Sequence, residues 1–275
     1  MDIFQAIILG LIQGITAWIP VSSKTQVIIW GTLLYGLSFK ELLSFAIAVH
    51  IGDIIASVYL FRNELMGILK VRPDPLTDIK NYEKLDENKK IAYFMFISLI
   101  CTAIVGLPLY LFFKQSFTDL ASNTLLALVG LLLITMSIIM YFSKAKSGEG
   151  KLTIKATILT GLAQGLAVLP GISRSGISES ALLLQNIDQS RAVKLSFIMS
   201  IPMILLAILG FYFTDGFELI NPTIILVGII SSTISAYLTM SFMLELVKRI
   251  KFYWFALIIG LIALIPLSLH LLLGL

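Results

Sequence analysis

Apolar residues run almost unbroken along this chain of 275 residues, and polar residues interrupt them at few places. Several apolar runs are about 20 residues long, the length of helix that crosses a bilayer's hydrocarbon core. Strands of a membrane barrel would instead alternate over segments of about ten residues. The pattern therefore predicts an all-α polytopic membrane protein. We expect helices over residues 2–18, 24–36, 40–62, 92–113, 121–143, 153–168, 175–187, 190–213, 222–247 and 252–273.

Polar residues gather in two segments. The longer one, 63–91, carries mixed charges, so we expect a solvated loop with some helix rather than a separate domain. The shorter one, "SKAKSGEGK" from Ser143 to Lys151, divides the chain near its middle. We expect a single membrane domain built from two repeats, residues 1–143 and 152–275.

Composition agrees with a membrane protein. The chain is 58% hydrophobic and 13% charged, whereas soluble domains carry roughly 25% charged residues. Cys101 is the only cysteine, which excludes a disulfide framework and a thiolate metal site. The net charge of +4 is modest, and no nucleic-acid signature is present.

The two halves share an interrupted hydrophobic segment. "GLIQG" at 10–14 returns as "GLAQG" at 161–165, and each is followed by a proline, then a serine three residues later, then a cation and a hydroxyl. Such interruptions at corresponding positions of two halves indicate a binding site near the membrane midplane. The matching residues are Pro20, Ser23, Lys24 and Thr25 in the first half and Pro170, Ser173, Arg174 and Ser175 in the second.

The distribution of Lys and Arg favours one topology, because cytoplasmic loops are enriched in these residues. If both interrupted segments are re-entrant hairpins and the six other long runs cross, Lys40 and Lys114 lie on one face. Lys24 and Arg174 then lie within the membrane, and every other basic residue lies on the opposite face. This predicts six transmembrane helices plus two re-entrant hairpins in an inverted-topology repeat, with both termini outside. Reading the hairpins as full crossings is the competing topology.

Two cations inside a membrane need a partner, because an uncompensated charge there is costly. One alternative is an internal salt bridge to Asp53 or Glu179. The other is an anion site, which the hydroxyls around both cations favour, since these motifs precede new helices and helix N-termini bind phosphate. A diphosphate, or one phosphate held from two sides, would suit the paired motifs. The hydroxyls are those of Ser22, Ser23, Thr25, Ser173, Ser175 and Ser178.

Four stretches, "LGLIQGITAWIPVSSKTQ", "HIGDIIA", "LPGISRSG" and "SFIMSIP", resemble the undecaprenyl-diphosphate phosphatase family, UppP or BacA, over nearly the whole chain. The resemblance implies six transmembrane helices, two re-entrant hairpins and a plasma-membrane location with the site facing outward. It also implies removal of the terminal phosphate of a polyprenyl diphosphate, which recycles the lipid carrier of cell-wall sugars. The partners would be polyprenyl diphosphate or monophosphate and membrane lipids, with a second copy of the chain in a homodimer.

The resemblance also assigns residues, with two departures. Ser23 matches the family's proposed nucleophile, Arg174 its phosphate-binding arginine and Gln13 an accepted (Glu/Gln) position. Ala17 stands where the family has glutamate, and Gln26 stands where it has histidine. The phosphate cradle would then consist of Ser22, Lys24, Thr25, Ser173, Arg174, Ser175, Gly176 and Ser178.

The departures matter because Ala17 and Gln26 cannot transfer protons. Glu179, Asp53 or His50 would have to substitute as base, or hold a divalent cation such as Mg or Ca. Otherwise the chain is an impaired phosphatase, or a translocase of polyprenyl monophosphate on the same scaffold; a small-anion transporter is the weaker third hypothesis. Ala17 is either natural or an engineered replacement.

The remaining motifs have simpler interpretations. The 10–14 and 161–165 segments have GxxxG spacing, which predicts close helix packing. Trp18, Trp30 and Trp254 are expected to be packing residues or interfacial anchors. His270 is expected at the membrane interface.

Overall fold

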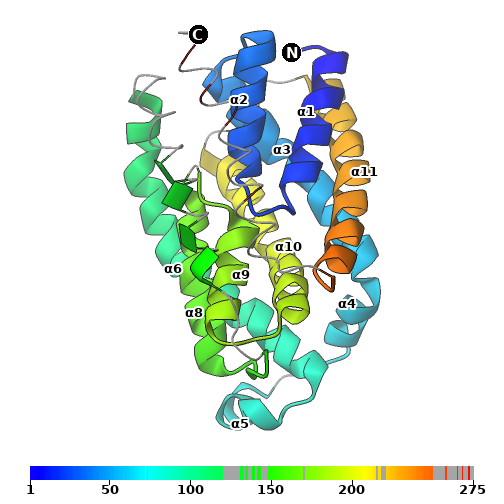
Figure 1. Ribbon diagram of the computed structural model, residues 1–275, viewed down its shortest axis with the longest axis vertical. Helices are drawn as coiled ribbons and strands as arrows, with labels where there is room; N and C mark the ends of the chain where they lie inside the picture. Colours follow the sequence, from blue (N-terminus) through cyan, green and yellow to red (C-terminus); the bar gives the residue numbers. More distant parts are fainter. Residues whose placement is uncertain are drawn as a thin grey trace.

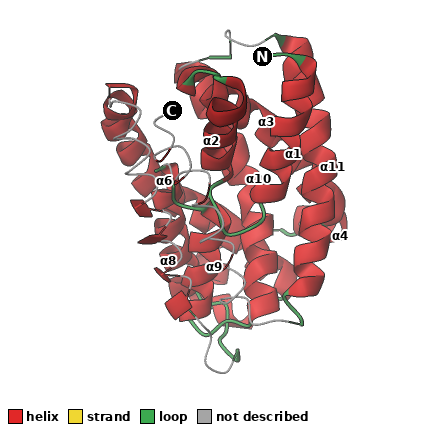
Figure 2. Ribbon diagram, turned by 45° about the horizontal axis from the view of Figure 1, so that its top comes forward, coloured by secondary structure: helices red, strands yellow, loops and turns green. Residues whose placement is uncertain are grey.

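The computed structural model describes residues 1–72, 74–119, 131–132, 134–135, 138–139, 141–143, 148–169, 171–214, 216–217, 221–249, 258, 265, 268 and 272, with side chains at 76 and 113–119 left out. Over this part of the chain the elements are helices, and one isolated β-bridge joins Glu149 to Ile187 (Figure 2). In chain order they are α1 (Ile3–Thr16), α2 (Ser23–Tyr35), α3 (Phe39–Leu60), α4 (Arg62–Leu69), α5 (Pro75–Lys80), η1 (Tyr82–Lys84), α6 (Glu87–Asp119), α8 (Ile154–Gly165), η2 (Leu166–Val168), α9 (Arg174–Leu184), α10 (Gln189–Thr214) and α11 (Pro222–Leu246).

The prediction of an all-α membrane protein is confirmed. Among the described residues, α3, α6 up to Phe112, α10 and α11 are long and apolar enough to cross a membrane. The predicted helices 121–143 and 252–273, with Trp254 and His270, lie wholly or largely outside the described residues, as does Pro170.

The predicted start of the fourth helix at residue 92 is wrong. Helix α6 begins at Glu87, because the Asp86 carboxylate accepts a hydrogen bond of 3.0 Å from the Lys89 backbone N–H. A carboxylate in this position satisfies one of the free N–H groups of the first helical turn. The apolar run alone gave no sign of this polar first turn, so the prediction began where the hydrophobic residues begin.

The polar segment 63–91 is a loop with short helices, as predicted. It is held to α6 by Asp78, whose carboxylate accepts hydrogen bonds from Lys89 Nζ (3.1 Å) and the Tyr93 hydroxyl (2.9 Å). A backbone hydrogen bond from Asp74 holds the pKa of Asp78 below its usual value, and the bonds from Lys89 and Tyr93 act in the same direction. The loop is therefore anchored to the membrane helix that follows it.

Helices α1 and α2 form one hairpin, and α8 and α9 form another. In Figure 1 the first hairpin occupies the upper part of the molecule and the second the lower part, and their turns approach each other at mid-height. The first turn forms because Pro20 cannot continue α1, and α2 restarts at Ser23 with Ser22 as its N-cap. In the second, α8 passes through η2 before α9 starts at Arg174. The predicted helix boundaries agree with these bounds to within a few residues.

The GxxxG segments pack closely, as predicted. A methyl group placed on Gly14 would lie 2.4 Å from the Ser232 carbonyl oxygen of α11, and one on Gly10 would lie 2.6 Å from the Gly228 oxygen. In the second hairpin, a methyl on Gly161 would lie 2.6 Å from the Ser98 oxygen of α6. Helix α1 therefore lies directly against α11, and α8 directly against α6, with backbone contacting backbone.

We expect Gly14→Ala and Gly161→Ala to destabilise the protein by about 1–3 kcal/mol each, because the facing helix backbone must move aside. Gly210→Ala is the matched control. Its added methyl meets nothing within 4 Å, and alanine favours a helix by about 1 kcal/mol over glycine. Thermal unfolding in detergent measures all three, and equal melting temperatures for the three variants would contradict the close packing.

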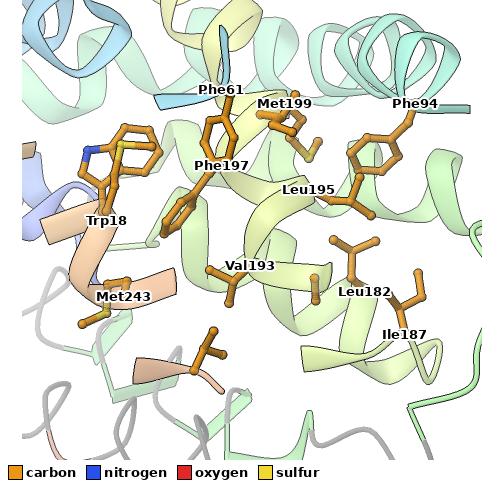
Figure 3. Packing of buried hydrophobic residues seen from close by; sticks show 14 of the residues in the cluster. Trp18, Phe61, Phe94, Leu182, Ile187, Val193, Leu195, Phe197, Met199 and Met243 are labelled. Atoms are coloured by element: carbon orange, nitrogen blue, oxygen red, sulfur yellow. The ribbon is translucent and has the colours of Figure 1, made fainter. Parts of the chain in front are cut away.

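Buried apolar side chains form two clusters. The larger lies around α10 and contains Trp18, Phe94 and Phe197 (Figure 3). The Trp18 and Phe197 rings meet edge to face, with centroids 4.8 Å apart. The smaller cluster joins α1, α2 and α3 through Leu9 and Phe45. The larger cluster fixes the first hairpin's turn against α10, which is close to the second hairpin.

Candidate functional site

The turns of the two hairpins are joined by hydrogen bonds. The Gly171 backbone N–H donates to Thr25 Oγ1 at 3.1 Å, and the Ser175 hydroxyl donates to the Ile19 carbonyl at 3.3 Å. Lys24 Nζ lies 3.5 Å from the Ala167 carbonyl oxygen. Gly171 has a φ of 95°, a conformation that favours glycine. The two motifs singled out in the sequence, some 150 residues apart, therefore meet in one place.

Two helix N-termini open at this junction. Helix α2 begins at Ser23, and α9 begins at Arg174. Ser173 caps α9, since its hydroxyl accepts from the Gly176 N–H at 3.3 Å. The Ser22 side chain leaves its helix uncapped and accepts from Thr25 Oγ1 at 3.0 Å instead. Free N–H groups and the positive ends of two helix dipoles favour an anion at such a junction.

The two cations have no carboxylate at ion-pair distance among the described residues. Lys24 and Arg174 are both partly exposed. The Arg174 guanidinium lies 5.1 Å above the Trp18 ring centroid, a cation–π contact. Within the part of the chain that the structure describes, its buried Nε has no hydrogen-bond partner. The alternative of an internal salt bridge is therefore not what the described part of the chain shows.

A buried hydrogen-bond network surrounds Ser23. Gln13 Nε2 lies 3.1 Å from Ser23 Oγ and 3.1 Å from Asp53 Oδ2. It also contacts His50 Nδ1. Asp53 itself lies 3.4 Å from His50 Nδ1 and accepts from the Ser232 hydroxyl of α11 at 3.3 Å. Asp53 is fully buried, so these contacts, together with the electrostatic attraction of Arg174, compensate for its lost hydration.

The equivalent network in the second half lacks acidic and basic groups. Gln164, the counterpart of Gln13, donates to Thr102 Oγ1 at 3.2 Å. Its carbonyl oxygen accepts from the Ser178 hydroxyl at 2.9 Å. Within the described residues, these contacts are made by amide and hydroxyl groups alone. The hydrogen-bonded network around Gln13 thus contains Asp53 and His50, whereas the network around Gln164 contains no titratable side chain among the described residues.

The remaining predicted site residues divide into three groups. Ser173 and Ser175 share a hydrogen bond of 3.2 Å at the junction. Ser178 is turned toward Gln164 and the Arg174 carbonyl, so its predicted place beside the cations is not where its hydroxyl points. The side chains of Ala17 and Gln26 are buried, and Ala17 belongs to the larger apolar cluster.

Glu179 is fully buried, and neither carboxylate oxygen has a hydrogen-bond partner among the described residues. It attracts Arg174 electrostatically, as Asp53 does. Unlike Asp53, Glu179 has no hydrogen bond that connects it to Ser23. Of the three residues that the sequence offered as a base, Asp53 and His50 are connected to Ser23 through Gln13, and Glu179 is not.

Sequence reasoning missed four contributors to the site. Trp18 was expected only to be a packing residue or an interfacial anchor, yet its ring also makes a cation–π contact with Arg174. Gln164 could have been found from its repeat position, because it matches Gln13. Ser232 and Thr102 lie within apolar helices and carry no local signal, since only the packing of α11 and α6 against the hairpins brings them here.

The residues present do not form a dedicated metal site. No group of three or more His, Cys, Asp or Glu side chains gathers in the part of the chain that the structure describes. Asp53 and His50 would supply two ligands, whereas hard divalent cations take six or more. A divalent cation therefore stays a prediction.

The chain matches known proteins over most of its length. The family "Bacitracin resistance protein BacA" matches residues 6–265. An undecaprenyl-diphosphatase from Methanococcoides burtonii is 31% identical over 271 residues, covering 98% of this chain and 100% of that protein. One from Haloarcula marismortui is 35% identical over 253 residues, covering 91% and 92%. One from Saccharolobus solfataricus is 40% identical over 214 residues, covering 75% and 72%.

Proposed function

Because this chain belongs to the BacA family of bacitracin resistance proteins, we propose that it is a multi-pass membrane phosphatase acting on a polyprenyl diphosphate of the undecaprenyl type. The similar proteins named undecaprenyl-diphosphatase support this assignment. The cleaved bond would be the phosphoric anhydride between the two phosphates. The products would be orthophosphate and the polyprenyl monophosphate that carries cell-envelope sugars.

One observation carries the proposal. Two cations without a carboxylate partner among the described residues meet beside a buried serine and two helix N-termini. Phosphoryl transfer depends mainly on positioning and on stabilising the charge of the transferred group. An arginine fork and an ammonium supply this positive charge. The site would lie in the membrane interior, where the head group of a lipid can enter it from the bilayer. A free cation pair in that location would otherwise be costly.

In the proposed reaction, Ser23 Oγ attacks the terminal phosphorus. The bond from phosphorus to the bridging oxygen breaks, and the polyprenyl monophosphate leaves with that oxygen. The Ser23 proton would pass through a water molecule to Asp53 or His50; Gln13, which donates to both Ser23 Oγ and Asp53, holds these groups together but does not itself carry the proton. Water then attacks the phosphoserine, returning the proton to Ser23 Oγ and releasing orthophosphate.

The finer topology belongs to the same proposal. Six transmembrane helices and two re-entrant hairpins in inverted repeats, residues 1–143 and 152–275, would bring the hairpin turns to the midplane from opposite sides. The joined turns support this arrangement (Figure 1). The site would open outward with both termini outside, as the distribution of Lys and Arg predicts.

We expect Ser23→Ala to lower phosphate release from polyprenyl diphosphate to the background measured without enzyme. Asp53→Asn should lower it about 10²–10⁴-fold, the usual effect of losing a general base. Ser200→Ala is the matched control, because Ser200 is a buried helical serine whose hydroxyl bonds only its own helix at Phe197. A Ser23→Ala variant with wild-type turnover would exclude the serine nucleophile.

A second candidate function is translocation of polyprenyl monophosphate. It is favoured by Ala17 and Gln26, which occupy the family's glutamate and histidine positions and cannot transfer protons. The cation pair would then hold the lipid's phosphate without hydrolysis. Transfer of a labelled monophosphate between the leaflets of proteoliposomes, with no phosphate release from the diphosphate, would support this function over the first.

A further inference from the structure

The two cations of the site each reach into the opposite hairpin. Lys24 belongs to the first hairpin, yet its Nζ lies at the Ala167 carbonyl oxygen of η2. Arg174 belongs to the second hairpin, yet its guanidinium lies on the Trp18 ring of the first. Each positively charged group thus lies against the hairpin opposite to the one that carries it.

The surroundings of the two cations differ. Arg174 is oriented toward the first hairpin, since its guanidinium lies on the Trp18 ring; Asp53 and Glu179 both attract it electrostatically. The network around Gln13 contains Ser23 and the proton acceptors. Lys24 Nζ lies at a backbone carbonyl oxygen of the second hairpin, and the hydrogen-bonded network of Gln164, Thr102 and Ser178 in that hairpin and α6 consists of amide and hydroxyl groups among the described residues. Arg174 is therefore the cation oriented toward the first hairpin, which carries Ser23, and Lys24 is the one oriented toward the second.

We infer that Lys24 forms a second anion subsite, which binds the phosphate that remains on the lipid, while Arg174 binds the phosphate that is removed. The inference rests on the proposed phosphatase function. The bridging oxygen gains negative charge as its bond to the terminal phosphorus breaks, and a cation fixed beside the leaving phosphate stabilises that charge. A lysine ammonium suits this task because it acts as a point charge and needs no bidentate geometry.

The test uses the full-length protein in detergent with two separate probes, farnesyl monophosphate and inorganic phosphate. We expect Lys24→Gln to weaken farnesyl monophosphate binding about tenfold or more, because one charge-assisted hydrogen bond is lost. The affinity of the same variant for inorganic phosphate should stay within about twofold of wild type. Arg174→Gln should do the reverse. Lys24→Arg, which keeps the charge, should retain most of the farnesyl monophosphate affinity.

The reciprocal pattern also shows that both variants are folded, because each keeps one ligand. Equal loss of both ligands in both variants would indicate one shared anion site and overturn the inference, as would an unchanged farnesyl monophosphate affinity in Lys24→Gln. Failure of the phosphatase function looks different. In that case, wild type and Ala17→Glu release no phosphate from the diphosphate. The reciprocal binding pattern can still be measured, and it tests the existence of two anion subsites independently of catalysis.

Discussion

Replacing Arg174 with glutamine should lower phosphate release from polyprenyl diphosphate by about 10³-fold or more, comparable to removal of an arginine that stabilises a transferring phosphoryl group. Arg174 begins α9, lies on Trp18 and has a buried Nε without a hydrogen-bond partner among the described residues. No described carboxylate lies at ion-pair distance from it, so its guanidinium can bind a ligand. Initial rates with purified protein and a polyprenyl diphosphate in detergent measure the effect.

Arg174→Lys is the matched control. It keeps the positive charge but loses the planar fork and the stacked contact with Trp18, so we expect a rate between those of wild type and Arg174→Gln. Melting temperatures of both variants separate a lost site from a lost fold. Near-wild-type rates in a folded Arg174→Gln would show that the transferred phosphate is bound elsewhere.

The Ala17→Glu substitution should raise phosphate release by about 10²–10⁴-fold, the usual contribution of a general acid or base. Ala17 follows the last turn of α1 and donates its N–H to the Gln13 carbonyl at 2.9 Å, so a side chain there starts one helical turn from Gln13. Because Ala17 is 7% exposed, the new carboxylate would be buried and would need a cation. Arg174, which lies on the ring of the adjacent residue Trp18, is a candidate for that cation.

Ala17→Gln is the control for this gain, since it adds the same bulk without a carboxylate. A rise in Ala17→Glu alone identifies the missing acid–base group as the cause of low activity. No rise in either variant, with the lipid still bound and the fold intact, would point to the translocase. A loss of thermal stability in both variants alike would reflect overpacking of the apolar cluster around Ala17.

Much of the site could be predicted from local signals. Pro20 ends α1, the hydroxyl-rich motifs begin α2 and α9, and the matching cations identify Lys24 and Arg174 as a pair. These features act within a few residues of the chain, so the sequence displays them directly. Their meeting was predicted from the repeat alone, and the hydrogen bonds between the turns confirm it.

The rest depends on packing between distant segments. Ser232 and Thr102 resemble ordinary small residues of apolar helices, and only their contacts with Asp53 and Gln164 give them a place in the site. Choosing between Asp53 and Glu179 was also beyond the sequence, because both are single acids in apolar surroundings. In three dimensions Gln13 contacts both Asp53 and Ser23, which is why we propose Asp53 rather than Glu179 as the base.

The close contacts of α1 with α11 and of α8 with α6 join the beginning of the chain to its later part, and the later hairpin to the earlier part. Each half thus has a helix face with glycines that packs against a helix of the other half. Neither half therefore buries its own glycine-bearing helix face. We expect the first hairpin to reach its final packing only after α11 has been synthesised and inserted.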